Sequence, residues 1–198
     1  LLARIIIPEK PGEGGESANY SSALKYDSSI DAIVKGTADG LMVVLNISAV
    51  LITFVALVAL VNVMLGGFWI GGEALSVERI LGVLFAPVAW LTGVQWSEAS
   101  QAGWLLGVKL TLTEFVAFVE LGKIAPEAMS ERTRMLMTYA LCGFANIGSV
   151  GITVTGLSVL LPERRQEVLG LVWKALVGGF LATLMTACIV GALPASIF

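Results

Sequence analysis

Two long stretches without a charged side chain constrain the fold more than any other feature of this sequence. Residues 40–72 form a run of 33 residues, and residues 135–162 form a second run of 28. About 20 apolar residues suffice to cross the hydrocarbon core of a bilayer, so each run is long enough to span it. Charged residues make up 14% of the chain, and soluble domains usually contain about a quarter. The sequence therefore predicts an all-α integral membrane protein in contact with the lipid bilayer.

The first run predicts a scaffold transmembrane helix over residues 40–66. Before it, residues 1–39 are predicted to hold the end of a preceding helix, a polar loop and an interfacial segment. The chain opens without a methionine, so we expect it to be the C-terminal piece of a longer protein. After the first run, residues 76–96 predict an interfacial helix that begins after Ser76 and is interrupted at Pro87.

The second run differs because its centre is polar and rich in glycine. Three glycines, Asn146 and Ser149 lie within residues 143–151. Glycine in a helix interior costs about 1 kcal/mol relative to Ala, and an unpaired polar group is costly in hydrocarbon. This pattern favours a discontinuous helix over residues 135–161, unwound at its middle so that its polar groups face a cavity. The alternative is close helix packing through small residues, with Asn146 hydrogen-bonded to a neighbouring helix.

Residues 97–123 have the pattern of a re-entrant helical hairpin. As helices, residues 97–109 would span about 20 Å and residues 115–123 about 14 Å, and neither crosses a core of about 30 Å. Thr113 and Glu114 form a polar tip between these two limbs. The chain is therefore predicted to enter and leave the membrane on the same side.

One continuous helix over residues 99–121 is the alternative to the hairpin, and it would bury Lys109 and Glu114 at an unfavourable depth. In the hairpin, Gly103 and Gly107 have the spacing that lets the first limb pack closely on a neighbour.

The hairpin tip and the predicted break lie at similar depth. Asn146 would lie about 15 Å into the membrane, and the limb lengths place Glu114 near the same level. Two irregular polar segments at one depth are typical of the substrate site of a secondary transporter. Residues 97–198, including a last helix over residues 168–193, are therefore predicted to form a transport unit. The alternative role for Glu114 is a structural ion pair with Lys109.

The composition argues against several other functions. The chain has no histidine, which removes Ser-His catalysis and the commonest metal ligand. Cys142 and Cys188 lie in apolar runs and are expected to be small packing residues, so no metal site or cofactor is predicted. A net charge of −3 argues against nucleic acid as a partner. An intramembrane enzyme would need a base beside Ser149, and none is visible, although this class and a channel-type pore remain alternatives.

Two specific stretches lie at the hairpin tip and at the predicted break, namely Glu114-Phe115-Val116-Ala117-Phe118 and Tyr139-Ala140-Leu141-Cys142-Gly143-Phe144-Ala145-Asn146-Ile147-Gly148-Ser149. Through these stretches, the sequence resembles the C-terminal half of the concentrative nucleoside transporters. The resemblance implies an ion-coupled symporter that imports nucleosides such as uridine across the cell (inner or plasma) membrane. It also implies a homotrimer of multi-pass protomers with an inverted repeat, in which each half contains a hairpin and a broken helix. The site of the coupling ion, Na+ or H+, would lie mostly in the N-terminal half.

The same resemblance assigns roles to single residues. Glu114 would accept hydrogen bonds from ribose hydroxyls, while Asn146 and Ser149 would hold the ribose from the unwound segment. Phe144 would pack against the bound nucleoside, and an ordinary lipid- or core-facing aromatic is the alternative. Thr113 is expected at the substrate site too, but it departs from the family pattern, which has Asn before the Glu.

Overall fold

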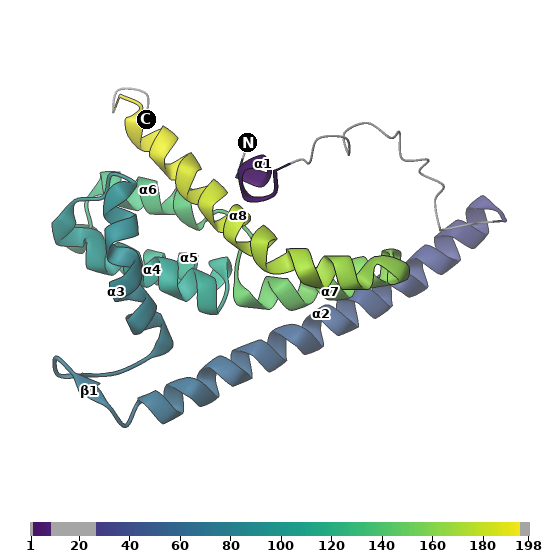
Figure 1. Ribbon diagram of the computed structural model, residues 1–198. Helices are drawn as coiled ribbons and strands as arrows, with labels where there is room; N and C mark the ends of the chain where they lie inside the picture. The colour runs from purple at the N-terminus through teal and green to yellow at the C-terminus, as the bar shows by residue number, and fades with distance from the viewer. Residues whose placement is uncertain (1, 9–26, 195–198) are drawn as a thin grey trace.

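The structure is a computed structural model that describes residues 2–8 and 27–194, and most of the predicted polar loop lies outside these residues. Helices make up most of this described part (Figure 1). The α-helices are α1 (Leu2–Ile6), α2 (Ser29–Leu65), α3 (Val77–Leu91), α4 (Trp96–Thr111), α5 (Glu114–Lys123), α6 (Glu131–Leu141), α7 (Ile147–Leu160) and α8 (Arg165–Ala192). Two 3-10 turns, η1 (Pro126–Ala128) and η2 (Pro162–Arg164), precede α6 and α8.

The connection between α2 and α3 contains a short β-hairpin that the sequence did not indicate. Strands β1 (Trp69–Ile70) and β2 (Glu73–Ala74) pair antiparallel. Gly71 and Gly72 connect them with φ values of 64° and 84°. A two-residue hairpin turn with positive φ at both positions favours glycine because glycine has no Cβ.

Helix α2 is longer than the predicted scaffold helix. It begins at Ser29 and contains 37 residues, so residues 29–39 are its first turns, and their location at the membrane interface stays a prediction. The early start has a local cause, because the Ser28 hydroxyl caps the helix by accepting a hydrogen bond from Asp31 N. Asp31 also pairs with Lys35 one turn later, at 2.8 Å. At 1.5 Å per residue α2 is about 56 Å long, well beyond a hydrocarbon core of about 30 Å.

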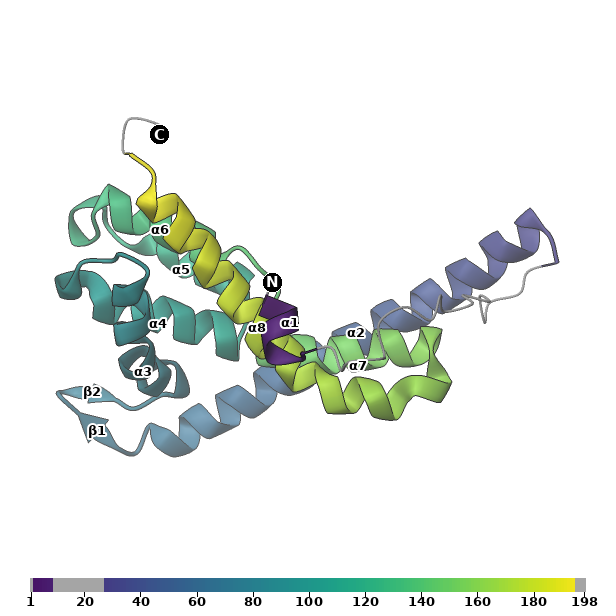
Figure 2. The same ribbon diagram turned by 45° about the horizontal axis from the view of Figure 1, so that its top comes forward.

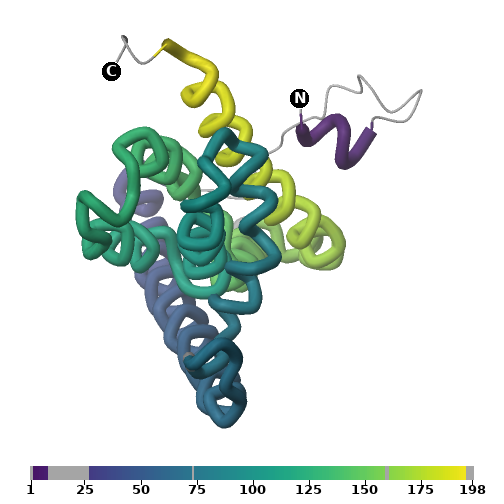
Figure 3. The backbone as a smooth tube through the Cα atoms, turned by 90° about the vertical axis from the view of Figure 1, so that its left-hand side faces the viewer, coloured from purple at the N-terminus to yellow at the C-terminus, as the bar shows by residue number. Residues whose placement is uncertain are grey.

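Two stretches in the described residues are long and apolar enough to cross a membrane, namely α2 and Pro162–Ala192. Figures 1 and 3 show α2 as a rod along one side of the molecule, with α3 to α6 gathered near its C-terminal end. Helix α7 packs against α2 on one side and against α8 on the other (Figure 2). A side chain at Gly151 of α7 would meet Val50 and Phe54 of α2, so glycine permits this close approach.

Helix α3 packs tightly against α4. Ser76 caps it, as predicted, by accepting a hydrogen bond from Arg79 N. A side chain at Gly103 of α4 would overlap the backbone of α3, and so would one at Gly107, which confirms the predicted close-packing role of both glycines. The predicted interruption at Pro87 was wrong, because α3 continues through it to Leu91. The packing of α3 on α4 stabilises the helix despite the backbone hydrogen bond that proline removes.

The buried core lies among α4, α5, α6 and α8. Its fully buried members include Leu105 and Leu106 from α4 and Leu136 and Met137 from α6. Helix α8 starts at Arg165, three residues before the predicted start, and it packs against α6 and α7 (Figure 1). This core holds the ends of α4, α6 and α7 in fixed positions relative to one another.

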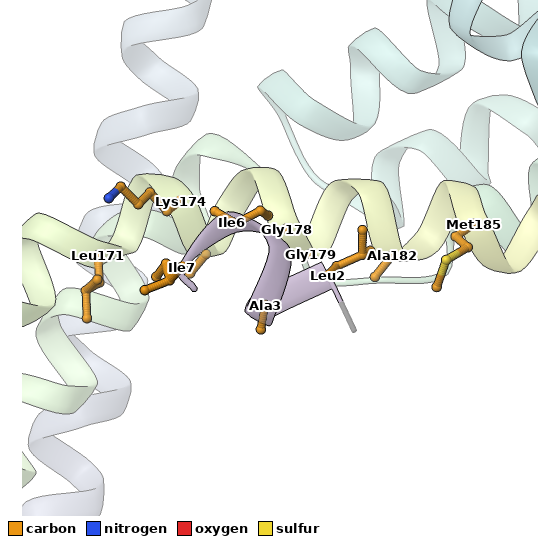
Figure 4. Close-up of a pocket in the computed structure, with 11 residues that line it drawn as sticks. Leu2, Ala3, Ile6, Ile7, Leu171, Lys174, Gly178, Gly179, Ala182 and Met185 are labelled. Carbon is orange, nitrogen blue, oxygen red and sulfur yellow. The ribbon is translucent and has the colours of Figure 1, made fainter. Parts of the chain in front are cut away.

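Helix α1 rests on α8 and leaves an apolar groove of about 590 Å³ between them (Figure 4). The contact is close at Gly178, where an added Cβ would lie 3.2 Å from the Ile6 side chain. The polar interactions described next lie outside this groove.

Candidate functional site

The hairpin tip is a sharp break between α4 and α5. Helix α4 ends at Thr111 and α5 begins at Glu114, so the single continuous helix considered for residues 99–121 does not form. Thr113 is the N-cap of α5, and its hydroxyl oxygen accepts a hydrogen bond from Val116 N at 3.2 Å. Glu114 is thereby the first residue of α5, where the positive end of the helix dipole favours a carboxylate.

The second break separates α6 from α7 at residues 142–146. Leu141 O accepts a hydrogen bond from Gly143 N, and Gly143 O accepts one from Ala145 N, at 2.8 and 2.9 Å. These short turns satisfy backbone groups that the interrupted helix would otherwise leave unpaired. The break occupies the first part of the predicted stretch, and helical structure resumes at Ile147.

Asn146 and Ser149 start α7 with a reciprocal capping box. Asn146 Oδ1 accepts a hydrogen bond from Ser149 N at 2.7 Å, and Ser149 Oγ accepts one from Asn146 N at 3.2 Å. This arrangement corrects the expectation that Ser149 lies in the unwound segment, because it occupies the first turn of α7. Two side chains that bond each other's backbone amides stabilise a helix start. The break therefore ends at Asn146.

The two breaks meet through Glu114 and Asn146. Asn146 Nδ2 donates a hydrogen bond to Glu114 Oε2 at 3.1 Å, across 32 residues of sequence. Asn146 is 1% exposed and Ser149 6% exposed, whereas Glu114 is only partly buried. A carboxylate and a carboxamide thus converge where two helices begin, which is an arrangement suited to a polar ligand with several hydroxyl groups.

Comparison with known proteins shows the family of this chain. The family model described as "Na+ dependent nucleoside transporter C-terminus" matches residues 1–191. This chain belongs to the concentrative nucleoside transporter family. Proteins of this family are membrane transporters, so the similarity favours transport over the enzyme alternative.

Several relatives are similar along nearly the whole chain. An uncharacterized transporter YutK of Bacillus subtilis is 41% identical over 96% of this chain and 48% of its own length. The nucleoside permease NupC of Helicobacter pylori is 39% identical over 96% of this chain and 47% of its own length. Sodium/nucleoside cotransporter 1 of Rattus norvegicus is 35% identical over 97% of this chain and 32% of its own length. The chain spans slightly less than half the length of these two bacterial relatives.

The fold agrees with that of a solved transporter. A structure of CNTnw in an intermediate state matches with a TM-score of 0.80 and 40% identity, over 96% of this chain and 47% of that protein. A structure of CNTnw in an inward-facing, substrate-bound state matches with a TM-score of 0.71 over the same share of this chain. The helical arrangement described above is therefore that of a concentrative nucleoside transporter.

Phe144 and Ser149 line a small cavity beside the family motif. The cavity lies between α7 and α8 and has a volume of about 100 Å³. Phe144 itself is 57% exposed, so it does not face the core, and the lipid-facing alternative stays open. Ligand pockets usually have volumes of about 300–1,000 Å³. This cavity is therefore too small to hold a whole nucleoside.

Lys109 does not form the ion pair with Glu114 that was the alternative explanation for the carboxylate. Within residues 27–194, Lys109 Nζ instead donates to Ala140 O at 2.8 Å and to Thr183 Oγ1 at 2.7 Å. The sequence could not indicate these partners, because they lie 31 and 74 residues away and one is a backbone oxygen.

A second polar cluster that the sequence did not indicate fixes the outer end of the hairpin. Glu98 in the first turn of α4 accepts hydrogen bonds from Ser130 N and Ser130 Oγ, at 2.8 and 2.9 Å. Ser130 is also the N-cap of α6. The hairpin is therefore joined to the broken helix at its outer end through Glu98 and at its tip through Glu114.

Proposed function

We propose that this chain is the C-terminal half of an ion-coupled symporter that imports nucleosides such as uridine. The hydrogen bond between Glu114 and Asn146 carries the proposal, because it brings together two polar chain breaks of a transporter fold. The names of the relatives, nucleoside permease and sodium/nucleoside cotransporter, support nucleosides as the substrate class.

In the proposed site, Glu114 accepts hydrogen bonds from ribose hydroxyls. Its partly exposed carboxylate has oxygen lone pairs beyond the one that Asn146 occupies. Asn146 and Ser149 contribute from α7, where the capping box fixes their rotamers. Phe144 offers its exposed ring to the nucleoside, since aromatic faces pack well against planar rings.

Thr113 has a more restricted role than a family Asn would have. Its oxygen accepts the capping bond from Val116 N, while its hydroxyl hydrogen can still be donated to a ligand. We propose that Thr113 contributes one donor to the substrate and otherwise fixes the start of α5.

Coupling to Na+ or H+, assembly as a homotrimer and location in the cell membrane are further parts of the proposal. Support for sodium comes from the names of the mammalian relatives. We place the coupling-ion site mostly in the other half of the protein.

Uptake of labelled uridine by the full-length protein in proteoliposomes tests the proposal. A symporter should show uptake that saturates with uridine concentration and that rises with an inward Na+ or H+ gradient. Uptake that rises without saturation over the same range would indicate a channel-type pore. Absence of uridine uptake under every ion gradient would contradict the proposed function.

A further inference from the structure

Lys109 is the largest side chain that is completely buried in the described residues. It lies in the last turns of α4, five residues before Glu114. A buried amine is costly unless its donors are satisfied. Nothing in the proposed substrate site uses this lysine, so its position requires a separate explanation.

Each donor direction of the Lys109 ammonium has a partner. Two hydrogen bonds lead to Ala140 O and Thr183 Oγ1, and the Phe180 ring centroid lies 5.1 Å from Nζ. An ammonium has three donors and no acceptor, and an aromatic face within about 6 Å attracts a cation. The Thr183 hydroxyl donates its own hydrogen to Phe180 O at 2.8 Å, which leaves its lone pairs for Lys109. The surroundings are thus those of a small buried cation.

The acceptor Ala140 O belongs to the last turn of α6. Carbonyl groups in the last turn of a helix lack intrahelical partners, and the negative end of the helix dipole lies there. In transporters, the C-terminal ends of broken helices coordinate Na+ or H+. In this chain, a lysine side chain occupies the corresponding position at the end of α6.

Lys109 and Glu114 together hold the hairpin to both sides of the break. Lys109 bonds to Ala140 before the break, and Glu114 bonds to Asn146 after it. Thr183 also lies against the break itself, because a side chain added at Gly143 would overlap Thr183. Movement of the α6 end relative to α4 would therefore displace Asn146 from Glu114.

We propose that the Lys109 side chain is a built-in cation that occupies the C-terminal end of α6 and positions the break beside the hairpin tip. The first part, that Lys109 acts as a cation at the end of α6, is argued from the contacts of Lys109 alone. The second part, that this positioning sets nucleoside affinity, rests on the proposed function.

Chemical rescue tests the first part without any transport measurement. In the full-length protein, Lys109→Ala removes a propylammonium group and leaves a cavity of its shape. We expect the variant to unfold at a lower temperature than the wild type in detergent. Addition of n-propylammonium should raise the unfolding temperature of the variant and leave the wild type unchanged. Neutral n-propanol should not do so. Equal effects of the two compounds on the unfolding temperature of the variant, or no effect of either, would overturn the proposal that Lys109 acts as a built-in cation.

The milder variant Thr183→Val tests the second part and remains informative if Lys109→Ala does not fold. It removes one acceptor of Lys109, so the KM for uridine should rise about 3- to 10-fold, within the range for one hydrogen bond. The maximal uptake rate should stay close to that of the wild type. Thr186→Val is the matched control, because Thr186 bonds only to Ala182 O one turn back in α8 among the hydrogen bonds of the described residues.

The outcomes of these two experiments separate the proposals. An unchanged KM in Thr183→Val, with normal wild-type uptake, would overturn the positioning role. If the wild type takes up no nucleoside, the proposed function fails, and rescue by propylammonium still decides whether Lys109 acts as a built-in cation.

Discussion

Asn146 Nδ2 donates a 3.1 Å hydrogen bond to Glu114 Oε2 and thereby joins the start of α7 to the start of α5. Both residues stand at the N-terminal end of a helix, and each helix is capped by a side chain of its own break. Thr113 caps α5, and Asn146 caps α7. The carboxylate therefore lies at the starts of two helices, where its oxygens can accept hydrogen bonds from hydroxyl groups of a ligand.

Asn146 caps α7 and donates a hydrogen bond to Glu114, and Asn146→Asp should separate these two functions. Aspartate is as good an N-cap as asparagine, so the start of α7 should be retained. The new carboxylate cannot donate to Glu114 and repels it. We expect uridine affinity to fall about 10-fold or more, since hydrogen bonds to charged groups contribute about 1.5–3 kcal/mol. Competition binding of uridine to the full-length protein measures this change.

Asn146→Ala is the comparison variant, because it removes both the cap and the donor. It should also unfold at lower temperature, by the equivalent of about 1 kcal/mol. If Asn146→Asp binds uridine as tightly as the wild type, the bond between Asn146 and Glu114 has no role in substrate affinity.

Ser149→Ala should destabilise the start of α7. The Ser149 hydroxyl accepts from Asn146 N and donates to Asn146 O at 2.6 Å, and both bonds are lost. A destabilisation of about 1 kcal/mol is expected, measured by thermal unfolding in detergent. Ser158→Ala in the same helix is the control, because among the described residues its buried hydroxyl has no hydrogen-bond partner. A larger loss for Ser158→Ala than for Ser149→Ala would contradict the capping box.

Gly103→Ala should loosen the packing of α4 on α3. The added Cβ would overlap the backbone at Gly82 and Ala86, and overpacking of this kind costs about 1–3 kcal/mol. Gly122→Ala is the matched control in α5, where an added Cβ meets nothing within 4 Å. The control should unfold at the same or a higher temperature, because alanine favours helix by about 0.5–1 kcal/mol. A Gly103→Ala variant as stable as the wild type would show that α3 and α4 can separate.

The positions of the helix breaks could be predicted from the sequence because local chemistry determines them. Thr113 before Glu114 and Asn146 three residues before Ser149 are capping patterns, and each starts a helix in the structure. The predicted cap at Ser76 follows the same rule. Ser149 was misplaced because a polar residue at a break was assumed to be unwound, whereas the capping box makes it helical.

Features that depend on distant packing could not be predicted. Pro87 is a local helix breaker, and the packing of α3 against α4 offsets its effect. The start of α2 at Ser29, by contrast, has a local cause in the Ser28 cap, which was missed because the mixed charges of this segment resemble a loop. Cys142 and Cys188 were expected to be packing residues but are exposed. The re-entrant course of the hairpin and the inverted repeat remain predictions.

Cysteine labelling tests the re-entrant course. Cys142 and Cys188 are free and exposed, so both are first replaced by serine. Ser97→Cys and Lys123→Cys then report the two outer ends of the hairpin, and Glu98 is left intact for its bonds to Ser130. An impermeant maleimide should label both positions from the same side of sealed vesicles. Labelling from opposite sides would replace the hairpin by a membrane-crossing segment.

The proposed substrate site is tested most directly by asking whether Glu114 recognises the ribose of uridine. Glu114→Gln keeps the shape of the side chain and removes its charge. If Glu114 accepts hydrogen bonds from the ribose, uridine should lose about 10- to 150-fold in affinity. The 2′- or 3′-deoxy analogue that lacks the bonded hydroxyl should lose less, so discrimination between it and uridine should shrink. The measurement is competition of uridine and both analogues against labelled uridine, in wild-type and Glu114→Gln full-length protein. A Glu114→Gln variant that binds uridine normally and rejects both analogues as strongly as the wild type would contradict the account.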